Sequence, residues 1–393
     1  MTAEVAILNN QGVAIAADSA VTIGLNSGEK KIYYTAEKIF KISDKHPIGV
    51  MIYSQADFMG INWKILIHEF SKQLGEKVFD TLEEYLDQLI SFLSEFKFIP
   101  VEKHIEYLGY ICFRTFSMVK EYYEKEIAEN NDSEKLKQDK IKILSDSIKK
   151  RNEELEKSSL VFHDFSGKFI KANSEFINDF AKKVFNDIHL SDKILDELMK
   201  LVILDVQKLD SNGLFKYSGI VMVGYGEREI FPSVCSSKIF GRLGDDLVHE
   251  LIDSSHITDE GQAMVYPFAQ TDVINTFIRG IDDDLQMHIT KLFFDILKNN
   301  IGLDNDSVGK LTEFFLENIN KIKTDNYRDP ILNIVASLPN INLAEMAQAL
   351  INITSLRRHV STDSETVGGP TDVAIISKID GFVWVKRKDN LSI

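Results

Sequence analysis

The spacing of apolar residues most constrains the fold of this chain, because its period changes along the sequence. Strands are predicted at both ends of the chain, where short apolar stretches alternate with turns that contain Asn, Gly and Asp. An Asp-Gly pair favours a hairpin between the last two of these strands. The expected strands cover residues 2–8, 13–17, 38–43, 48–54, 372–378 and 381–387. Further strands are expected over 216–240.

Between these strands the apolar period becomes helical. From about residue 56 one helix face collects Met59, Trp63, Leu66, Ile67, Phe70 and Leu74, and helices continue to about residue 209. Later helices are expected from Thr271 to Gly280, over 284–324, and over 342–357 with Asn342 as N-cap. The charged stretch 134–157 fits either a coiled-coil arm or an ordinary solvated helix face.

Strands at opposite chain ends that share a sheet close a domain around what lies between them. We therefore expect one domain over residues 1–393, with a helical insertion at 75–210 and a second at 284–340. The fold class expected from this pattern is α+β.

Charge and cysteine content exclude several classes of function. The net charge of −15 disfavours general binding to nucleic acid or to anionic membranes. Two cysteines cannot build a disulfide scaffold, and the chain shows neither a signal-peptide pattern nor an apolar run that could span a membrane. A cytoplasmic protein is expected.

Three residues near the N-terminus combine into a chemically complete site. Removal of Met1 would expose Thr2, whose hydroxyl needs a base and whose own α-amine has an unperturbed pKa of about 7.7–8.0. Lys38 would favour the oxyanion, and Asp18 would hold Lys38 charged and oriented. In isolation, each residue is more simply an ordinary strand residue or a strand-edge charge; together they favour catalysis.

The segment TAEVAILNNQGVAIAADS, followed by EKIFKIS, resembles the opening of proteasome β subunits and of the related bacterial HslV-type peptidase. A weaker resemblance covers 219–281 and 342–388. The resemblance to this family implies the four-layer αββα sandwich of N-terminal nucleophile hydrolases. It puts the nucleophile on Thr2, the aspartate on Asp18 and the lysine on Lys38. It also implies no cofactor, a peptide or protein substrate and a homo-oligomeric ring or stack, and it leaves open an unfoldase or regulator as partner.

The chain departs from this family pattern at the supporting residues. Ser54 stands where the oxyanion-donating glycine is usual, although the donor is a backbone N–H. The supporting serine falls near Gln270 or Thr271, and a late Asp-Ser-Gly support falls within 363–368. A catalytically inactive scaffold subunit and a small-molecule amidase on the same fold therefore stay as alternatives.

Other motifs carry less weight. His249-Glu250 begins like a zinc-binding helix, but Asp253 stands where a second histidine is needed, so no metal site is expected. The acidic residues from Asp304 favour a helix cap over a calcium loop. Cys112 and Cys235 are read as buried spacers.

Overall fold

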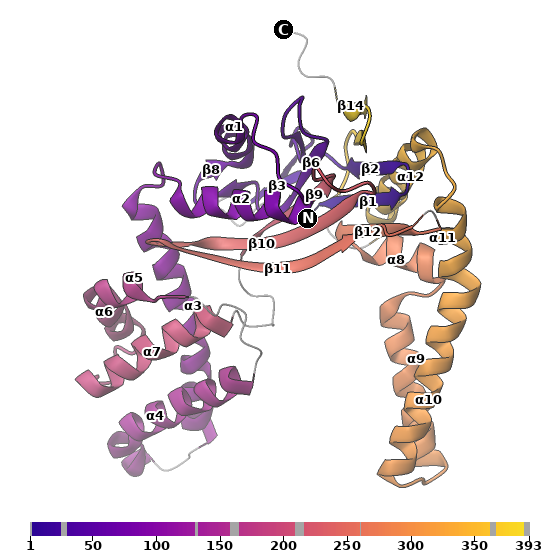
Figure 1. The fold of residues 1–393 in the computed structure, drawn as a ribbon. Coiled ribbons are helices and arrows are strands. Elements are labelled where there is room, and N and C mark those ends of the chain that lie inside the picture. The colour runs from indigo at the N-terminus through magenta and orange to yellow at the C-terminus, as the bar shows by residue number, and fades with distance from the viewer. Residues whose placement is uncertain are drawn as a thin grey trace.

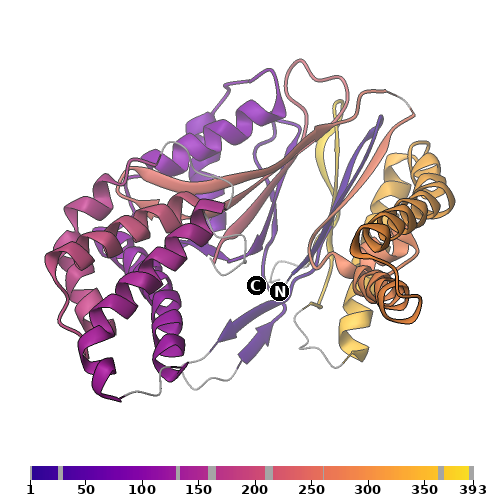
Figure 2. The ribbon, with the colours of Figure 1, turned by 90° about the horizontal axis from the view of Figure 1, so that it is seen from below.

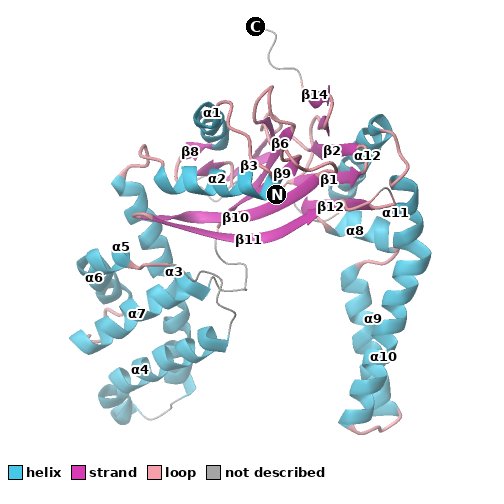
Figure 3. Ribbon diagram, in the orientation of Figure 1, coloured by secondary structure: helices cyan, strands magenta, loops and turns pink. Residues whose placement is uncertain are grey.

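Two antiparallel five-stranded sheets and surrounding helices make up the fold (Figures 1 and 3). The computed structural model describes residues 2–24, 30–129, 133–157, 165–208, 216–259, 261–361 and 367–388. The first sheet has the order β12 (Ala263–Ala269), β1 (Ala3–Asn9), β2 (Gly12–Ala17), β13 (Asp372–Ser377) and β14 (Gly381–Lys386). The second has the order β11 (Asp246–His256), β10 (Ser233–Leu243), β9 (Ser218–Gly224), β6 (Ile48–Ser54) and β5 (Ile39–Lys41).

Strands β1 and β2 of the first sheet are buried along their whole length, and they are almost continuously apolar. Along β1, Ala6 and Leu8 contribute to a core that also contains residues of β6, β9 and β10, so this face looks toward the second sheet. The alternate residues Ala3, Val5 and Ile7 pack with helices α8 (Asp272–Arg279), α11 (Asp329–Val335) and α12 (Asn340–Val360). Figure 2 shows the two sheets side by side, with helices on both outer sides.

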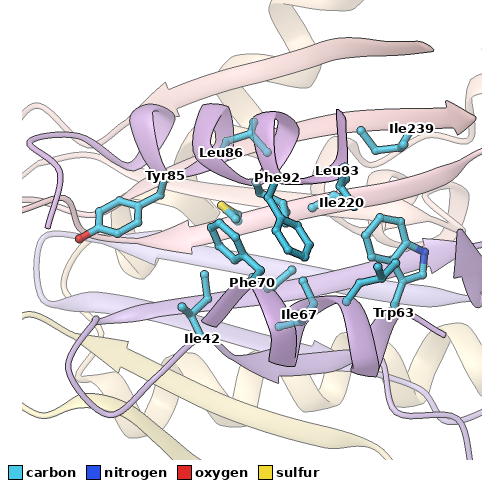
Figure 4. Packing of buried hydrophobic residues seen from close by; sticks show 14 of the residues in the cluster. Ile42, Trp63, Ile67, Phe70, Tyr85, Leu86, Phe92, Leu93, Ile220 and Ile239 are labelled. Atoms are coloured by element: carbon cyan, nitrogen blue, oxygen red, sulfur yellow. The ribbon is translucent and has the colours of Figure 1, made fainter. Parts of the chain in front are cut away.

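Helices α1 (Trp63–Leu74) and α2 (Leu82–Glu95) cover the outer face of the second sheet. Their buried aromatic and aliphatic side chains pack on β9 and β10 (Figure 4). The Asn62 side chain accepts the Lys64 N–H and starts α1 there, so Met59 precedes the helix, beside the short strands β7 (Asp57–Phe58) and β8 (Ile61–Asn62). A capping box between Thr81 and Glu84 starts α2.

A second group of helices lies beside the far end of the second sheet (Figure 1). It contains α3 (Val101–Glu129), α4 (Ser133–Lys157), α5 (Lys168–Ala172), α6 (Ser174–Val184) and α7 (Asp192–Lys208). Helix α4 buries Leu144, Ile148 and Leu155 in the core of this group, so the charged stretch is an amphipathic helix with one packed face. Arg151 and Asp205 form a buried ion pair of 2.8 Å between α4 and α7.

Helices α9 (Asp283–Asp295) and α10 (Asn305–Lys323) form an antiparallel pair that projects from the first sheet's helical layer (Figure 1). Short π-helical turns flank α10 at Ile296–Asn300 and Thr324–Arg328. Phe293 and Phe315 stack between the two helices, with ring centroids 4.3 Å apart. Asp304 accepts the Ser307 N–H as the N-cap of α10, which confirms the cap interpretation.

The strand predictions at both ends are confirmed, but several elements differ from expectation. The sequence did not predict β11 or β12. Between Asp18 and Lys38, β3 (Val21–Gly24) and β4 (Lys30–Tyr33) form a hairpin, as the family resemblance implies. The N-cap prediction at Asn342 is wrong: α12 begins at Asn340 after Pro339, and Asn342 lies in the first turn, where its amide donates to Glu345. Pro339, with φ −60° and an extended ψ, fixes the helix start earlier than the apolar spacing indicates.

Candidate active site

Thr2 immediately precedes β1 and is buried, with 6% of its surface exposed. Side chains alternate along a strand, so Thr2 shares a face of β1 with Glu4 and Ala6, the face directed at the second sheet. The Thr2 carbonyl accepts the Gln270 N–H at 3.1 Å, next to the pairing of Ala3 with Ala269. Met1 lies outside the described residues.

Asp18 holds the chain immediately after Thr2. The β1–β2 hairpin pairs Glu4 with Ala17, which brings Asp18 beside Ala3. Asp18 Oδ1 accepts the Ala3 N–H at 2.9 Å, and the Asp18 N–H donates to the Ala3 carbonyl at 3.1 Å. Oδ2 accepts the N–H groups of Ala20 at 3.1 Å and Gly368 at 3.0 Å. These bonds fix the carboxylate and the peptide group that follows Thr2.

Lys38 completes a buried ion pair with Asp18. Its Nζ lies 2.6 Å from Asp18 Oδ1, and both side chains are almost fully buried. The Lys38 carbonyl accepts the Ile52 N–H at 2.9 Å, which ties the residue to β6. Burial lowers the pKa of Lys38, while the charge and hydrogen bond of Asp18 oppose that shift. The geometry therefore fixes the Lys38 Nζ beside the Asp18 carboxyl group.

One cavity of about 280 Å³ is lined by Thr2, Lys38 and Ser54. Its other walls come from the chain before β5, the end of β6 and the start of α1, including Ala20, Thr35, Phe40, Tyr53 and Trp63. The structure thus brings three of the predicted site residues to one concave surface, and Asp18 touches two of the segments that form it.

Ser54 has a backbone conformation that favours glycine. Its φ is +73°, in the left-handed region, where a Cβ is strained. We expect Ser54→Gly to raise the free energy of unfolding by about 0.5–1 kcal/mol, because relief of strain exceeds the added chain entropy. Urea denaturation measures this change. Gln55→Gly, next in the chain and without a positive φ, should lower stability, and equal effects of the two changes would contradict the strain.

Two contributors to the site, Gln270 and Gly368, lie in the segments where the family resemblance puts supporting residues, and sequence reasoning missed a third. Gly368 is 350 residues from Asp18, and Gln270 is similarly remote from Thr2, so no local pattern connects them. Of the late segment expected to give support, 363–366 lie outside the described residues. Thr271 precedes α8 and makes no side-chain cap bond there. Glu4 is the third: a glutamate in an apolar strand was the available signal.

Glu4 is completely buried, and desolvation raises its pKa to about 8. Lys38 opposes this shift, and Asp18 adds to it. The folded chain therefore keeps a proton that the unfolded chain loses near the ordinary glutamate pKa of 4.5, so stability falls as the pH rises between these values. We expect urea denaturation to show about 3 kcal/mol more loss between pH 5 and pH 8 in the parent protein than in Glu4→Gln. Parallel curves would contradict this.

The His and Cys side chains of the described residues do not form a second candidate site. Among the described residues, no group of three or more His, Cys, Asp or Glu side chains is placed to hold a metal ion, and His249 lies on strand β11. Burial raises the pKa of both cysteine thiols, that of Cys112 to about 12, so neither is a ready nucleophile. Across the same described ranges, no helix has the length and apolarity needed to cross a membrane.

Comparison with known proteins gives distant likenesses only. No protein-family model and no curated protein matches the chain. Among solved structures, an Anbu (Gly-1) mutant from Hyphomicrobium sp. strain MC1 overlaps 99% of this chain and 86% of its own, with 9% identity and a TM-score of 0.30. Anbu, an ancestral beta-subunit, from Yersinia bercovieri overlaps 98% and 86%, with 9% identity and a TM-score of 0.29. Overlap at this TM-score does not establish a shared fold.

Proposed function

We propose that this protein is an N-terminal threonine amide hydrolase. The observation that supports it best is the buried Lys38–Asp18 ion pair beside Thr2, with Thr2, Lys38 and Ser54 lining one cavity. Burying a charge pair costs desolvation free energy. Its position next to a residue that can become the chain terminus therefore indicates a role in catalysis.

In the proposed reaction, removal of Met1 frees the Thr2 α-amine. The amine takes the proton of the Thr2 hydroxyl as Oγ attacks an amide carbonyl, and it then delivers that proton to the leaving amine. The positive charge of Lys38 lowers the energy of the alkoxide, and the N–H of Ser54 binds the tetrahedral oxyanion. The acyl-enzyme ester is cleaved by water, with the amine again acting as base.

We further propose that the two sheets and their outer helices form the four-layer αββα sandwich of N-terminal nucleophile hydrolases, as the proteasome β and HslV-type resemblance implies. Residues 1–393 then form one domain, with α3–α7 inside the insertion at 75–210 and α9–α10 inside that at 284–340. A homo-oligomeric ring or stack acting on peptides fits this proposal.

A second candidate function is that of an inactive scaffold subunit. The resemblance puts the family's supporting serine near Gln270 or Thr271, and this chain has no serine at either position. Intact-mass measurement of the purified protein separates the candidates: loss of Met1 is expected for the hydrolase, and complete retention favours the scaffold. A panel of peptides and small acylamides then separates a peptidase from a small-molecule amidase.

A further inference from the structure

Glu4 lies two residues from Thr2 on the same face of β1. The residues opposite it on the neighbouring strands are Ala17 and Phe268, so it sits within an apolar layer between the sheets. Glu4 is fully buried, and neither of its carboxyl oxygens has a hydrogen-bond partner in the described part of the chain. A carboxylate in such a place would carry a charge without donors, which is strongly disfavoured.

The neighbouring carboxyl has the opposite environment. Asp18 accepts hydrogen bonds from three backbone N–H groups and from the Lys38 ammonium. Lys38 thus interacts electrostatically with two buried carboxyls. Its ion pair and the three backbone donors are with Asp18. The negative charge therefore belongs on Asp18 and the proton on Glu4, in agreement with the raised pKa of Glu4.

The charged and titratable groups around Glu4 come from several elements. Asp18 follows β2, Lys38 precedes β5, and Tyr53 lies on β6, where burial raises the pKa of its phenol. Lys388 acts on Lys38 from beyond β14, but it is paired with Asp372 at 3.3 Å. With Glu4 protonated these groups balance in charge. Release of the Glu4 proton to solvent leaves one uncompensated negative charge beside Lys38.

We propose that Glu4 is a positioning residue that acts through Lys38. When Glu4 is neutral, the Lys38 ammonium interacts with Asp18 and Thr2. When Glu4 is a carboxylate, it competes for that ammonium and the reaction stops. The inference rests on the proposed function. Its consequence is a site that works at neutral pH and loses reactivity in alkaline solution, through a group that never touches the substrate.

The test measures the rate at which a peptide epoxyketone modifies Thr2, from pH 6 to pH 9, by intact-mass spectrometry. At each pH the rate for Glu4→Gln is divided by the rate for the parent protein. The titration of the Thr2 amine affects both rates and cancels in this quotient. We expect this quotient to rise about tenfold across the range, because glutamine keeps the neutral form. Glu76→Gln removes the same charge at an exposed ion pair and should give a flat quotient.

Three outcomes would overturn the proposal. A flat quotient for Glu4→Gln would show that Glu4 does not govern Lys38. A falling quotient would show that the carboxylate keeps Lys38 charged instead of diverting it. Absence of any adduct on the parent protein at every pH would overturn the proposed function and the switch together, whereas the first two outcomes leave the proposed function intact.

Discussion

Replacing Thr2 with alanine should abolish amide hydrolysis, with a rate loss on the order of 10⁴-fold or more, because the only proposed nucleophile disappears. Thr2 lies at the edge of the cavity and its backbone makes the bonds that hold it, so alanine should leave the fold unchanged. Hydrolysis of a peptide or acylamide cleaved by the parent protein measures the loss, and thermal unfolding checks the fold.

Thr2→Ser is the matched variant, because it keeps both a hydroxyl and a free amine after Met1 removal. It should retain measurable hydrolysis where Thr2→Ala has none. Full activity of Thr2→Ala, against a substrate that the parent cleaves, would contradict the mechanism and place the chemistry elsewhere.

Lys38→Met should lower kcat/KM by about 10²–10³-fold, because the cation beside the developing alkoxide is lost while the shape of the side chain is largely kept. Asp18 keeps its three backbone donors, which limits the damage to the fold. The comparison needs kcat/KM and the free energy of unfolding on the same preparations.

Lys41→Met provides the control for this substitution. Lys41 ends β5, the strand that follows Lys38, but its ion pair is with Asp44 on the surface. We expect a change of less than about threefold, as is usual for exposed ion pairs. Equal losses in both variants would mean that charge in general, and not the buried pair, controls the rate.

Local patterns predicted the parts of the site that depend on neighbouring strands. The Asn/Gly turn between 2–8 and 13–17 sets the register that pairs Glu4 with Ala17, and this register places Asp18 next to Ala3. The same turn chemistry predicted β13 and β14 at the other end of the chain.

The remaining parts depend on contacts over long sequence separations. No local period indicates that Gly368 donates to Asp18, or that Gln270 donates to Thr2. Strand β11 was missed because its second half is half-exposed and lacks a clear apolar alternation. Burial of Glu4 follows from a second sheet that its own strand does not reveal.

Peptide mapping by mass spectrometry after treatment with an epoxyketone tests directly whether Thr2 is a terminal nucleophile. This reagent closes a morpholine ring only when a hydroxyl and a free amine belong to the same terminal residue. We expect loss of Met1 and a morpholine adduct on Thr2. Retention of Met1 with Thr2 unmodified would contradict the proposed mechanism.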